Sequence, residues 1–378
     1  MTSRARPVAR LLYAASETDA DILYPTGFFA PDPFLFVLAR GRRVMVMSDL
    51  EMDRARMQAR VDEVMSWSCL AKDEEAAGGK ATPGAVIARA LRVLRVRRVE
   101  VPRAFPLGLA MELDERGVRL EVGPDPFWPQ RERKRPDEVR AIQASLRAAE
   151  AGLEAGLAAL RACAIGRDGW LRRGGRRFTA EDLRAAVNER IMALGCVPAH
   201  TICAPGDQAV DPHEEGHGPL RAHEAVVMDI FPRSERTGYF GDLTRTVVRG
   251  RASERLKEVY ALVAEGVRLG HRRVRPGASG QAIHREIQDL FTARGYPTGE
   301  KDGRMQGFFH GTGHGLGLQI HEPPSISTRP STLRAGHVVT VEPGLYYLGL
   351  GGLRIEDVAL VTATGSRNLT RVPKVLEI

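Results

Sequence analysis

The chain has 378 residues, of which 43% are hydrophobic and 27% charged, a length and composition typical of a folded protein with two domains. No segment approaches the roughly 20 consecutive apolar residues that cross a bilayer, so we expect no membrane partner. The net charge is +8. Because the basic residues are spread along the chain and none lies in a nucleic-acid-reading motif, we also expect no nucleic-acid partner.

The start of the chain and the cysteines indicate a cytoplasmic enzyme. Met1–Pro7 is basic but has no apolar segment of about 7–15 residues behind it, which argues against a secretory signal. The four cysteines form no Cys-x-x-Cys pair and are too few for a disulfide framework. We therefore expect reduced thiols, with Cys203 as a packing thiol rather than a nucleophile.

Residues 1–130 are predicted to form a first, smaller α/β domain. Its expected elements, in chain order, are a strand–turn–strand at 34–38 and 44–47, an amphipathic helix at 50–60, a loop at 71–83, a helix at 85–94 and a strand at 99–101. This part of the sequence contains no cluster of metal-ligating residues. We expect it to be a lid or an oligomerisation domain.

Residues 131–378 are predicted to form the second domain, because the proline-dense stretch at 123–129 indicates a linker. A long amphipathic helix is expected from Asp137, where apolar residues recur three and four positions apart. The capping residues that open the next three helices are Thr179, Ser253 and Ser279. Two helices precede each of two hairpin-like stretches, so the domain is predicted to consist of two related halves.

The runs 225–231 and 241–248 are expected to pair as antiparallel strands, and so are the runs 338–344 and 353–361. Each run carries an acid among apolar neighbours, and the acids of interest are Asp229, Asp242, Glu342 and Glu356. A buried carboxylate is costly unless a cation or a hydrogen bond compensates it, and carboxylates crowded together repel one another. We therefore predict a site for two divalent ions, whose charge matches four carboxylates.

The segment His310–Gly317 has a glycine at every second position. It does not match the dinucleotide pattern Gly-x-Gly-x-x-Gly, so close approach of the backbone is the better reason for the glycines. Such an approach would let His314 reach the metals while His310 faces the cavity, with His321 as a third histidine nearby. His310 and His314 could instead be ordinary core or surface histidines, but their spacing of four residues and the third histidine nearby favour the site.

The motifs that contain these residues, in this order, resemble those of the pita-bread metallopeptidases, family M24, which includes Xaa-Pro aminopeptidases, prolidases and methionine aminopeptidases. The motifs are Asp229 with Gly-Asp242-Leu-Thr-Arg-Thr, His310-Gly-Thr-Gly-His314-Gly, His321-Glu-Pro, Val-Glu342-Pro-Gly and Arg354-Ile-Glu356-Asp. The resemblance covers about residues 135–378, and the stretch at 24–28 is similar to the N-terminal domain of the creatinase/prolidase branch. It implies an α/β (α+β) chain of the proline-directed branch, with a C-terminal pita-bread fold and a smaller N-terminal α/β domain of the creatinase/prolidase type.

The resemblance also implies roles for nine residues. The expected metal ligands are Asp229, Asp242, His314, Glu342 and Glu356, with Asp242 and Glu356 bridging two divalent ions and Glu342 also acting as acid and base. The expected cavity residues are His213, His310, His321 and Arg354, of which His310 and His321 would steady the developing oxyanion. Manganese is the expected metal, with cobalt, iron or zinc as alternatives. The expected partners are peptides and a second copy of the chain in a homodimer.

Two departures from the family pattern affect the expected function. The turn between Asp229 and Asp242 is longer than usual by about two residues, which a surface turn accommodates without moving the strand ends. Ser325 stands where some dipeptidases have an arginine that pairs with the carboxylate of the dipeptide. The sequence therefore favours cleavage of the N-terminal bond in Xaa-Pro peptides, with a prolidase that cleaves Xaa-Pro dipeptides as the alternative. A metal-free creatinase-like C–N hydrolase and a non-catalytic peptide-binding module are the alternatives from other classes.

Overall fold

The computed structural model describes residues 8–301 and 303–378, and the chain divides into two units, Met1–Arg131 and Glu132–Ile378. The expectation about Met1–Pro7 lies outside the described residues. Among the residues that are described, no helix combines the length and the apolar composition needed to cross a membrane.

The first unit is built on a six-stranded mixed sheet in the order β4-β3-β2-β1-β5-β6. Its strands are β1 (Ala9–Ala14), β2 (Phe34–Ala39), β3 (Arg42–Met47), β4 (Glu63–Ser66), β5 (Arg98–Val101) and β6 (Arg119–Val122). Phe34 and Phe36 of β2 pack into one apolar cluster, and Leu35 and Val37 pack into another. Because both faces are covered, β2 is a continuous apolar run, as strands buried on both sides are.

Five helices cover this sheet in the described residues, and only the second and the fourth of them were predicted from the sequence. They are α1 (Ala20–Thr26), α2 (Met52–Gln58), α3 (Trp67–Ala76), α4 (Pro83–Val93) and α5 (Leu107–Glu115). The predicted loop at 71–83 is wrong in its first half, because α3 continues to Ala76. Ser66 caps this helix by accepting the N–H of Cys69, and the buried Glu74 pairs with Arg92 and Arg116.

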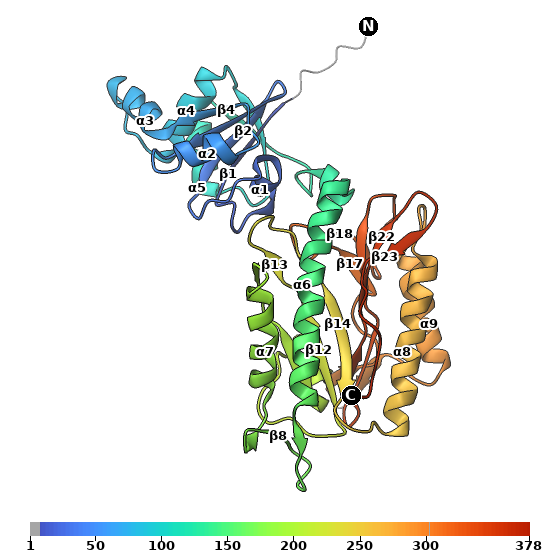
Figure 1. The fold of residues 1–378 in the computed structure, drawn as a ribbon. Coiled ribbons are helices and arrows are strands. Elements are labelled where there is room, and N and C mark those ends of the chain that lie inside the picture. The colour runs from blue at the N-terminus through green and yellow to red at the C-terminus, as the bar shows by residue number, and fades with distance from the viewer. Residues whose placement is uncertain (1–7, 302) are drawn as a thin grey trace. The chain divides into compact units, whose positions relative to one another are not determined.

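The four α-helices in the described part of the second unit begin close to where the sequence predicts. They are α6 (Pro136–Arg161), α7 (Ala180–Met192), α8 (Glu254–Arg273) and α9 (Gly280–Ala293). The side chains of Thr179, Ser253 and Ser279 each accept a backbone N–H from the first turn of α7, α8 and α9. In Figure 1, α6 and α7 lie on one side of the strands of this unit and α8 and α9 lie on the other.

The strands of the described part of this unit form a five-stranded sheet, β18-β17-β19-β22-β23, two three-stranded sheets, β11-β12-β14 and β7-β8-β9, and two-stranded hairpins. They are β7 (Ala164–Ile165), β8 (Leu171–Arg173), β9 (Arg176–Arg177), β10 (Cys196–Val197), β11 (Ile202–Pro205), β12 (Ala225–Ile230), β13 (Arg233–Ser234), β14 (Leu243–Val248), β15 (Gly299–Lys301), β16 (Arg304–Gln306), β17 (Gly313–Gly315), β18 (Glu322–Ile326), β19 (Val338–Val341), β20 (Gly344–Tyr347), β21 (Gly351–Arg354), β22 (Asp357–Val361) and β23 (Ser366–Asn368). The predicted antiparallel pairings are confirmed as β12 with β14 and β19 with β22. The second one is interrupted, because β20 and β21 pair separately.

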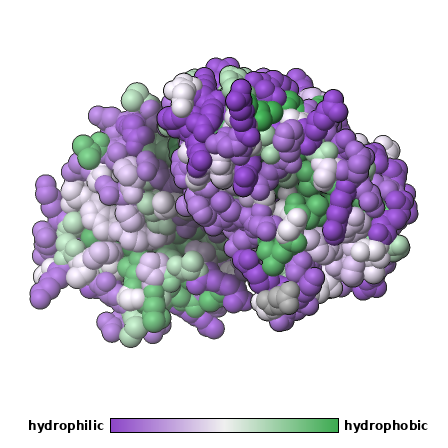
Figure 2. Space-filling view, turned by 90° about the horizontal axis from the view of Figure 1, so that it is seen from below, coloured by the Kyte–Doolittle hydropathy of each residue, from purple (hydrophilic) through white to green (hydrophobic). Residues whose placement is uncertain are grey.

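Each pair of helices in the second unit buries its own apolar core against the strands. Leu146 of α6 and Leu183 of α7 share one cluster with Met228, whereas Val263 of α8 and Ile287 of α9 lie in a second cluster. The face of the molecule in Figure 2 is mainly hydrophilic, with hydrophobic residues in small separate patches. Scattered apolar residues of this kind are normal on a protein surface.

Candidate metal centre

The acids predicted to bind metal lie mostly at the ends of strands. Asp229 is inside β12, as predicted, but Asp242 precedes β14, Glu342 lies between β19 and β20, and Glu356 lies between β21 and β22. The prediction that every acid is embedded in a strand is therefore wrong for three of them. Pro343 follows Glu342 and has no N–H to continue the ladder, so the chain changes strand partner there.

The glycines around His314 allow the close approach that the sequence predicts. A Cβ atom on Gly313 would clash with the carbonyl of Thr340, and one on Gly315 would clash with the carbonyls of Glu322 and Pro323. Only glycine therefore fits on either side of His314, whose backbone is packed against both neighbouring strands.

The side chains of the predicted ligands converge. Nε2 of His314 lies 3.2 Å from Oε1 of Glu342 and 3.6 Å from Oδ2 of Asp242. Ligand atoms of Asp242, His314 and Glu356 all lie within 4.8 Å of one another. Asp229 joins this group through the hydroxyl of Thr244, which is 2.8 Å from Oδ1 of Asp229 and 2.9 Å from Oε2 of Glu356. Carboxylates and one imidazole at such distances form a donor set that suits divalent cations.

The electrostatics of the cluster favour a bound cation. Burial raises the pKa of Asp242 and of Glu356 well above the ordinary range, and the neighbouring carboxylates raise it further. Burial alone would lower the pKa of His314, but its hydrogen bond with Glu342 and the charges of Glu342 and Asp242 raise it to about 9. Burial acts to raise the pKa of Glu342, but His314 outweighs it and holds that pKa below its usual range. The site thus concentrates negative charge that protons neutralise, and a cation would displace those protons.

One buried atom is left for such a cation. Oε1 of Glu356 is inaccessible to solvent and has no hydrogen-bond partner among the residues that the structure describes. An unsatisfied buried carboxylate oxygen is costly, and coordination to an ion would remove that cost. The residues present therefore fit a divalent metal.

These side chains line a cavity of about 590 Å³. All nine predicted site residues line it: Asp229, Asp242, His314, Glu342 and Glu356, together with His213, His310, His321 and Arg354. Apolar walls come from Phe231, Phe309 and Ile320, and His213 is exposed to solvent. The residues predicted from the sequence are spread between positions 213 and 356, and the fold brings them together at one cavity.

His310 is held in one orientation on this wall. Its Nδ1 donates to the carbonyl of Gly311 at 2.7 Å, so its Nε2 accepts the hydroxyl proton of Tyr346 at 2.8 Å. Burial lowers the pKa of His310 to about 4, which keeps the ring neutral. Both ring nitrogens are engaged within the protein, which does not suit the predicted role of His310 as an oxyanion donor.

The ring nitrogens of His321, in contrast to those of His310, are not engaged within the described part of the protein. Its ring stands edge-to-face with that of His314, with 4.4 Å between the centroids, and no hydrogen bond to its ring nitrogens is found among the described residues. Burial lowers its pKa, and the charge of His314 lowers it further. A neutral imidazole keeps one N–H donor, so His321 can donate into the cavity.

Arg354 connects Asp229 to Tyr346. Its Nη2 lies 2.6 Å from Oδ2 of Asp229, and its Nη1 donates to the hydroxyl of Tyr346 at 2.9 Å. Burial raises the pKa of Tyr346 to about 12, so this residue stays a neutral donor to His310. Sequence reasoning missed Tyr346, and it also missed Thr244 and Thr340, although both threonines lie two positions from a predicted ligand.

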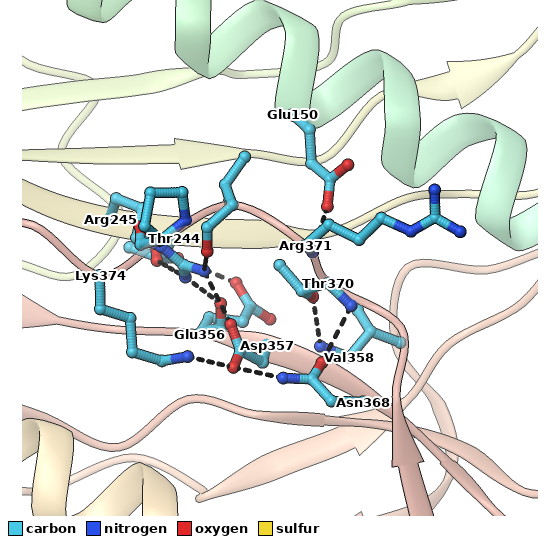
Figure 3. Close-up of polar contacts among 12 residues, drawn as sticks. Glu150, Thr244, Arg245, Glu356, Asp357, Val358, Asn368, Thr370, Arg371 and Lys374 are labelled. Carbon is cyan, nitrogen blue, oxygen red and sulfur yellow. Dashed lines mark hydrogen bonds and ion pairs between the residues drawn. The ribbon is translucent and has the colours of Figure 1, made fainter.

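The acid that follows Glu356 lies in a separate network (Figure 3). Oδ1 of Asp357 accepts from Arg245 at 2.8 Å, and its Oδ2 accepts from Lys374 and Asn368. Arg245 also donates to the backbone carbonyl of Glu356. Asp357 is thus paired with cations inside the protein and takes no part in the donor set.

Cys203 has the environment expected of a packing thiol. It is fully buried, and burial raises its pKa to about 12, so the thiolate required of a nucleophile is not formed near neutral pH. The three other cysteines are also free thiols.

Comparison with known proteins agrees with this geometry. The profile of metallopeptidase family M24 matches residues 140–363. Two curated relatives are the peptidase YqhT of Bacillus subtilis, 44% identical over 142 residues, and the Xaa-Pro dipeptidase of Pyrococcus horikoshii, 35% identical over 178 residues. These matches cover 37% and 47% of this chain and 38% and 48% of the relatives, so the chain aligns with less than half of their length.

Solved structures match over almost the whole chain. The X-Pro aminopeptidase of Thermotoga maritima superposes with a TM-score of 0.82 at 22% identity, covering 98% of this chain and 97% of its own. The prolidase of Pyrococcus horikoshii superposes with a TM-score of 0.78 at 23% identity, covering 98% and 95%. These likenesses confirm the predicted pita-bread fold with its smaller N-terminal part. Since the family profile spans more than half of the sequence, the chain belongs to metallopeptidase family M24.

Proposed function

We propose that the protein is a metal-dependent exopeptidase that removes the N-terminal residue from peptides whose second residue is proline. The observation that carries this proposal is the cluster of Asp242, His314 and Glu356, whose ligand atoms lie within 4.8 Å of one another at a cavity large enough for a short peptide. The printed names of the relatives, Xaa-Pro dipeptidase and X-Pro aminopeptidase, support the same substrate class.

The position of each residue suggests its role in this reaction. Asp229, Asp242, His314, Glu342 and Glu356 would hold two divalent ions, which supply a polarised carbonyl and a water that ionises near neutral pH. Glu342 would take the proton of the attacking water and pass it to the amine that leaves when the C–N bond breaks. His321 would donate to the oxygen of the tetrahedral carbon, while His310 would shape the wall through Tyr346 and Gly311.

The cavity favours peptides longer than a dipeptide. Ser325 and Ser327 line it and hydrogen-bond to each other at 3.0 Å, so this position offers no cation for the C-terminal carboxylate of an Xaa-Pro dipeptide. Phe231 and Phe309 give an apolar surface that suits a proline ring. A prolidase activity on dipeptides is the second candidate, supported by the dipeptidase relative.

The test compares turnover of Xaa-Pro with that of Xaa-Pro-Xaa peptides after Mn²⁺ is added to the purified protein, together with its metal content. We expect near two equivalents of metal per chain and a higher kcat/KM for the tripeptides. Absence of metal with hydrolysis of another C–N bond would favour the creatinase-like alternative. Absence of both metal binding and hydrolysis would favour a peptide-binding module.

Ser325→Arg is expected to shift the preference towards dipeptides. A guanidinium here would pair with the C-terminal carboxylate of Xaa-Pro, and a charge-assisted hydrogen bond of ~1.5–3 kcal/mol corresponds to a gain of roughly tenfold or more in kcat/KM. Ser327→Arg is the matched control, because it adds the same charge two positions away in the same cavity. An unchanged ratio of dipeptide to tripeptide kcat/KM in Ser325→Arg would contradict this assignment of the substrate's C-terminal end.

The remaining features of the proposal follow the resemblance to the family. Manganese is proposed as the metal, with cobalt, iron or zinc as alternatives that the same ligands accept. The compartment is proposed to be the cytoplasm, and the assembly a homodimer, which light scattering on the eluted protein measures directly.

A further inference from the structure

Two buried threonines lie directly behind the predicted ligands. The side chains of Thr244 in β14 and Thr340 in β19 have no exposed surface, and each residue is two positions from an acid, Asp242 or Glu342. Residues two apart along an extended chain project to the same side. Both hydroxyls therefore lie next to the acids and have to find polar partners there.

The hydroxyl of Thr340 connects two predicted ligands with a defined direction. It accepts the backbone N–H of His314 at 3.0 Å and lies 3.0 Å from Oε1 of Glu342. Since a peptide N–H can only donate, the single proton of the hydroxyl goes to Glu342. The backbone of one predicted ligand and the carboxylate of another are thus fixed relative to each other.

The hydroxyl of Thr244 occupies the corresponding place on the other side of the cluster. It contacts Oδ1 of Asp229 at 2.8 Å and Oε2 of Glu356 at 2.9 Å, and it accepts from Nε of Arg354 at 3.3 Å. In Figure 3, Thr244 of β14 lies near Glu356, which stands between β21 and β22. The two hydroxyls together contact four of the five predicted ligands.

We propose that Thr244 and Thr340 are positioning residues, each serving one half of the metal centre. Thr244 lies between the carboxylates of Asp229 and Glu356 and can donate its single proton to one of them at a time, and Thr340 sets His314 and Glu342. A hydrogen bond to one oxygen of a carboxylate fixes which oxygen remains for the ion, and partners of this kind contribute about 10–100-fold to metal affinity. This inference rests on the proposed function, because it requires that the cluster binds metal.

The test is the replacement of each threonine by valine, which keeps the shape and removes the hydroxyl. Full-length protein stripped of metal is titrated with Mn²⁺ by calorimetry, and the electron paramagnetic resonance spectrum is recorded at one and two equivalents. We expect Thr340→Val to bind one of the two equivalents about 10–100-fold more weakly and the other almost as wild type does. We expect Thr244→Val to weaken one equivalent more than the other, because Asp229 would serve one ion whereas Glu356 would bridge both. At two equivalents the spectrum should then change from that of two neighbouring ions to that of a single bound ion plus free Mn²⁺.

Three matched variants separate positioning from a general loss of stability. Thr244→Ser and Thr340→Ser retain the hydroxyl and are expected to restore the wild-type titration. Thr26→Val removes a fully buried hydroxyl in the first unit, where it donates to Ile22, and should leave Mn²⁺ binding unchanged. Thermal melting of every variant shows that the compared proteins are folded.

The outcomes distinguish this inference from the function on which it rests. If wild type binds two equivalents and both valine variants bind them equally well, the inference is overturned and the proposed function stands. If each valine variant weakens both equivalents alike, the division into two halves is wrong. If wild type binds no Mn²⁺, the proposed function fails, and the positioning roles fail with it.

Discussion

Asp242→Asn is expected to abolish metal-dependent turnover and, at the same time, to stabilise the metal-free fold. Asp242 is 4% exposed and lies 3.6 Å from Nε2 of His314, in the middle of the predicted ligands. The amide has the same shape but no charge, so the proposed metal site would lose one of its ligands. Loss of several kcal/mol of transition-state stabilisation corresponds to a fall of roughly 1,000-fold or more in kcat/KM, measured on an Xaa-Pro-Xaa peptide with Mn²⁺.

The stabilising part follows from the pKa of Asp242, which burial and the charge of Asp229 raise well above the ordinary range. A carboxyl whose pKa is higher in the folded state contributes stability below its unfolded pKa of about 3.9, and this contribution is lost as the pH rises. Metal-free wild type should therefore melt at a lower temperature at pH 8 than at pH 5. In Asp242→Asn this difference should shrink, and at pH 8 the variant should melt at least about 2 °C higher, the shift that ~1 kcal/mol produces.

The control is Asp168→Asn, which removes an exposed carboxylate paired with Arg172 on the β7–β9 hairpin and should alter neither turnover nor the effect of metal. With Mn²⁺ present, the order of stability should reverse, since wild type gains the free energy of metal binding and Asp242→Asn gains little of it. An Asp242→Asn variant that keeps wild-type kcat/KM would show that the acids do not form the catalytic centre.

Elements that depend on neighbouring residues were predictable from the sequence. Thr179, Ser253 and Ser279 cap their helices through bonds that span three residues, so the signal is local. The helix at 67–76 was missed because the contacts of Glu74 with Arg92 and Arg116 join positions 18 and 42 apart. Because the sequence alone does not reveal such distant partners, a charged segment of this kind is predicted to be a loop.

The residues of the site also fall into those that the sequence could predict and those that it could not. The predicted ligands are marked by isolated acids in apolar runs and by the order of the motifs, whereas Tyr346 carries no such mark. Its neighbour Tyr347 has the same side chain, yet it donates to the carbonyl of Pro297 outside the cavity, while Tyr346 joins His310 and Arg354. The pairing of β20 with β21 decides which of the two tyrosines reaches His310 and Arg354. The engaged ring of His310 depends on the same pairing, so its role could not be read from the sequence.

Among the proposed substitutions, Asp357→Asn is expected to cause the largest loss in the free energy of unfolding. The ion pair with Arg245 is buried, with side-chain exposures of 2% for Arg245 and 1% for Asp357 and a separation of 2.8 Å. Replacing one partner of such a pair leaves the other charge uncompensated in the interior and costs about 3–5 kcal/mol. Urea denaturation at pH 7 measures this loss. Glu286→Gln, which breaks the more exposed pair with Arg273, is expected to cost less than about 1 kcal/mol.

The contribution of Asp357 to stability should change with pH in the opposite direction to that of Asp242. Burial acts to raise the pKa of Asp357, but His271, Arg245 and Lys374 outweigh it and hold that pKa well below its usual range. A carboxyl with a lowered folded pKa contributes stability above its unfolded pKa of about 3.9, and this contribution is lost as the pH falls below that value. Wild type should therefore lose stability steeply below about pH 4, and the slope should be smaller in Asp357→Asn.

Glu356→Gln completes this comparison, because Glu356 and Asp357 are consecutive residues with opposite surroundings. Glu356 lies among other acids, so its removal should stabilise the metal-free protein at neutral pH, whereas removal of Asp357 should destabilise it. Two uncharged amides one position apart would then shift the urea midpoint in opposite directions. Midpoints that move in the same direction would mean that the acids of the predicted metal centre are neutralised within the protein, as Asp357 is, and that no cation is needed there.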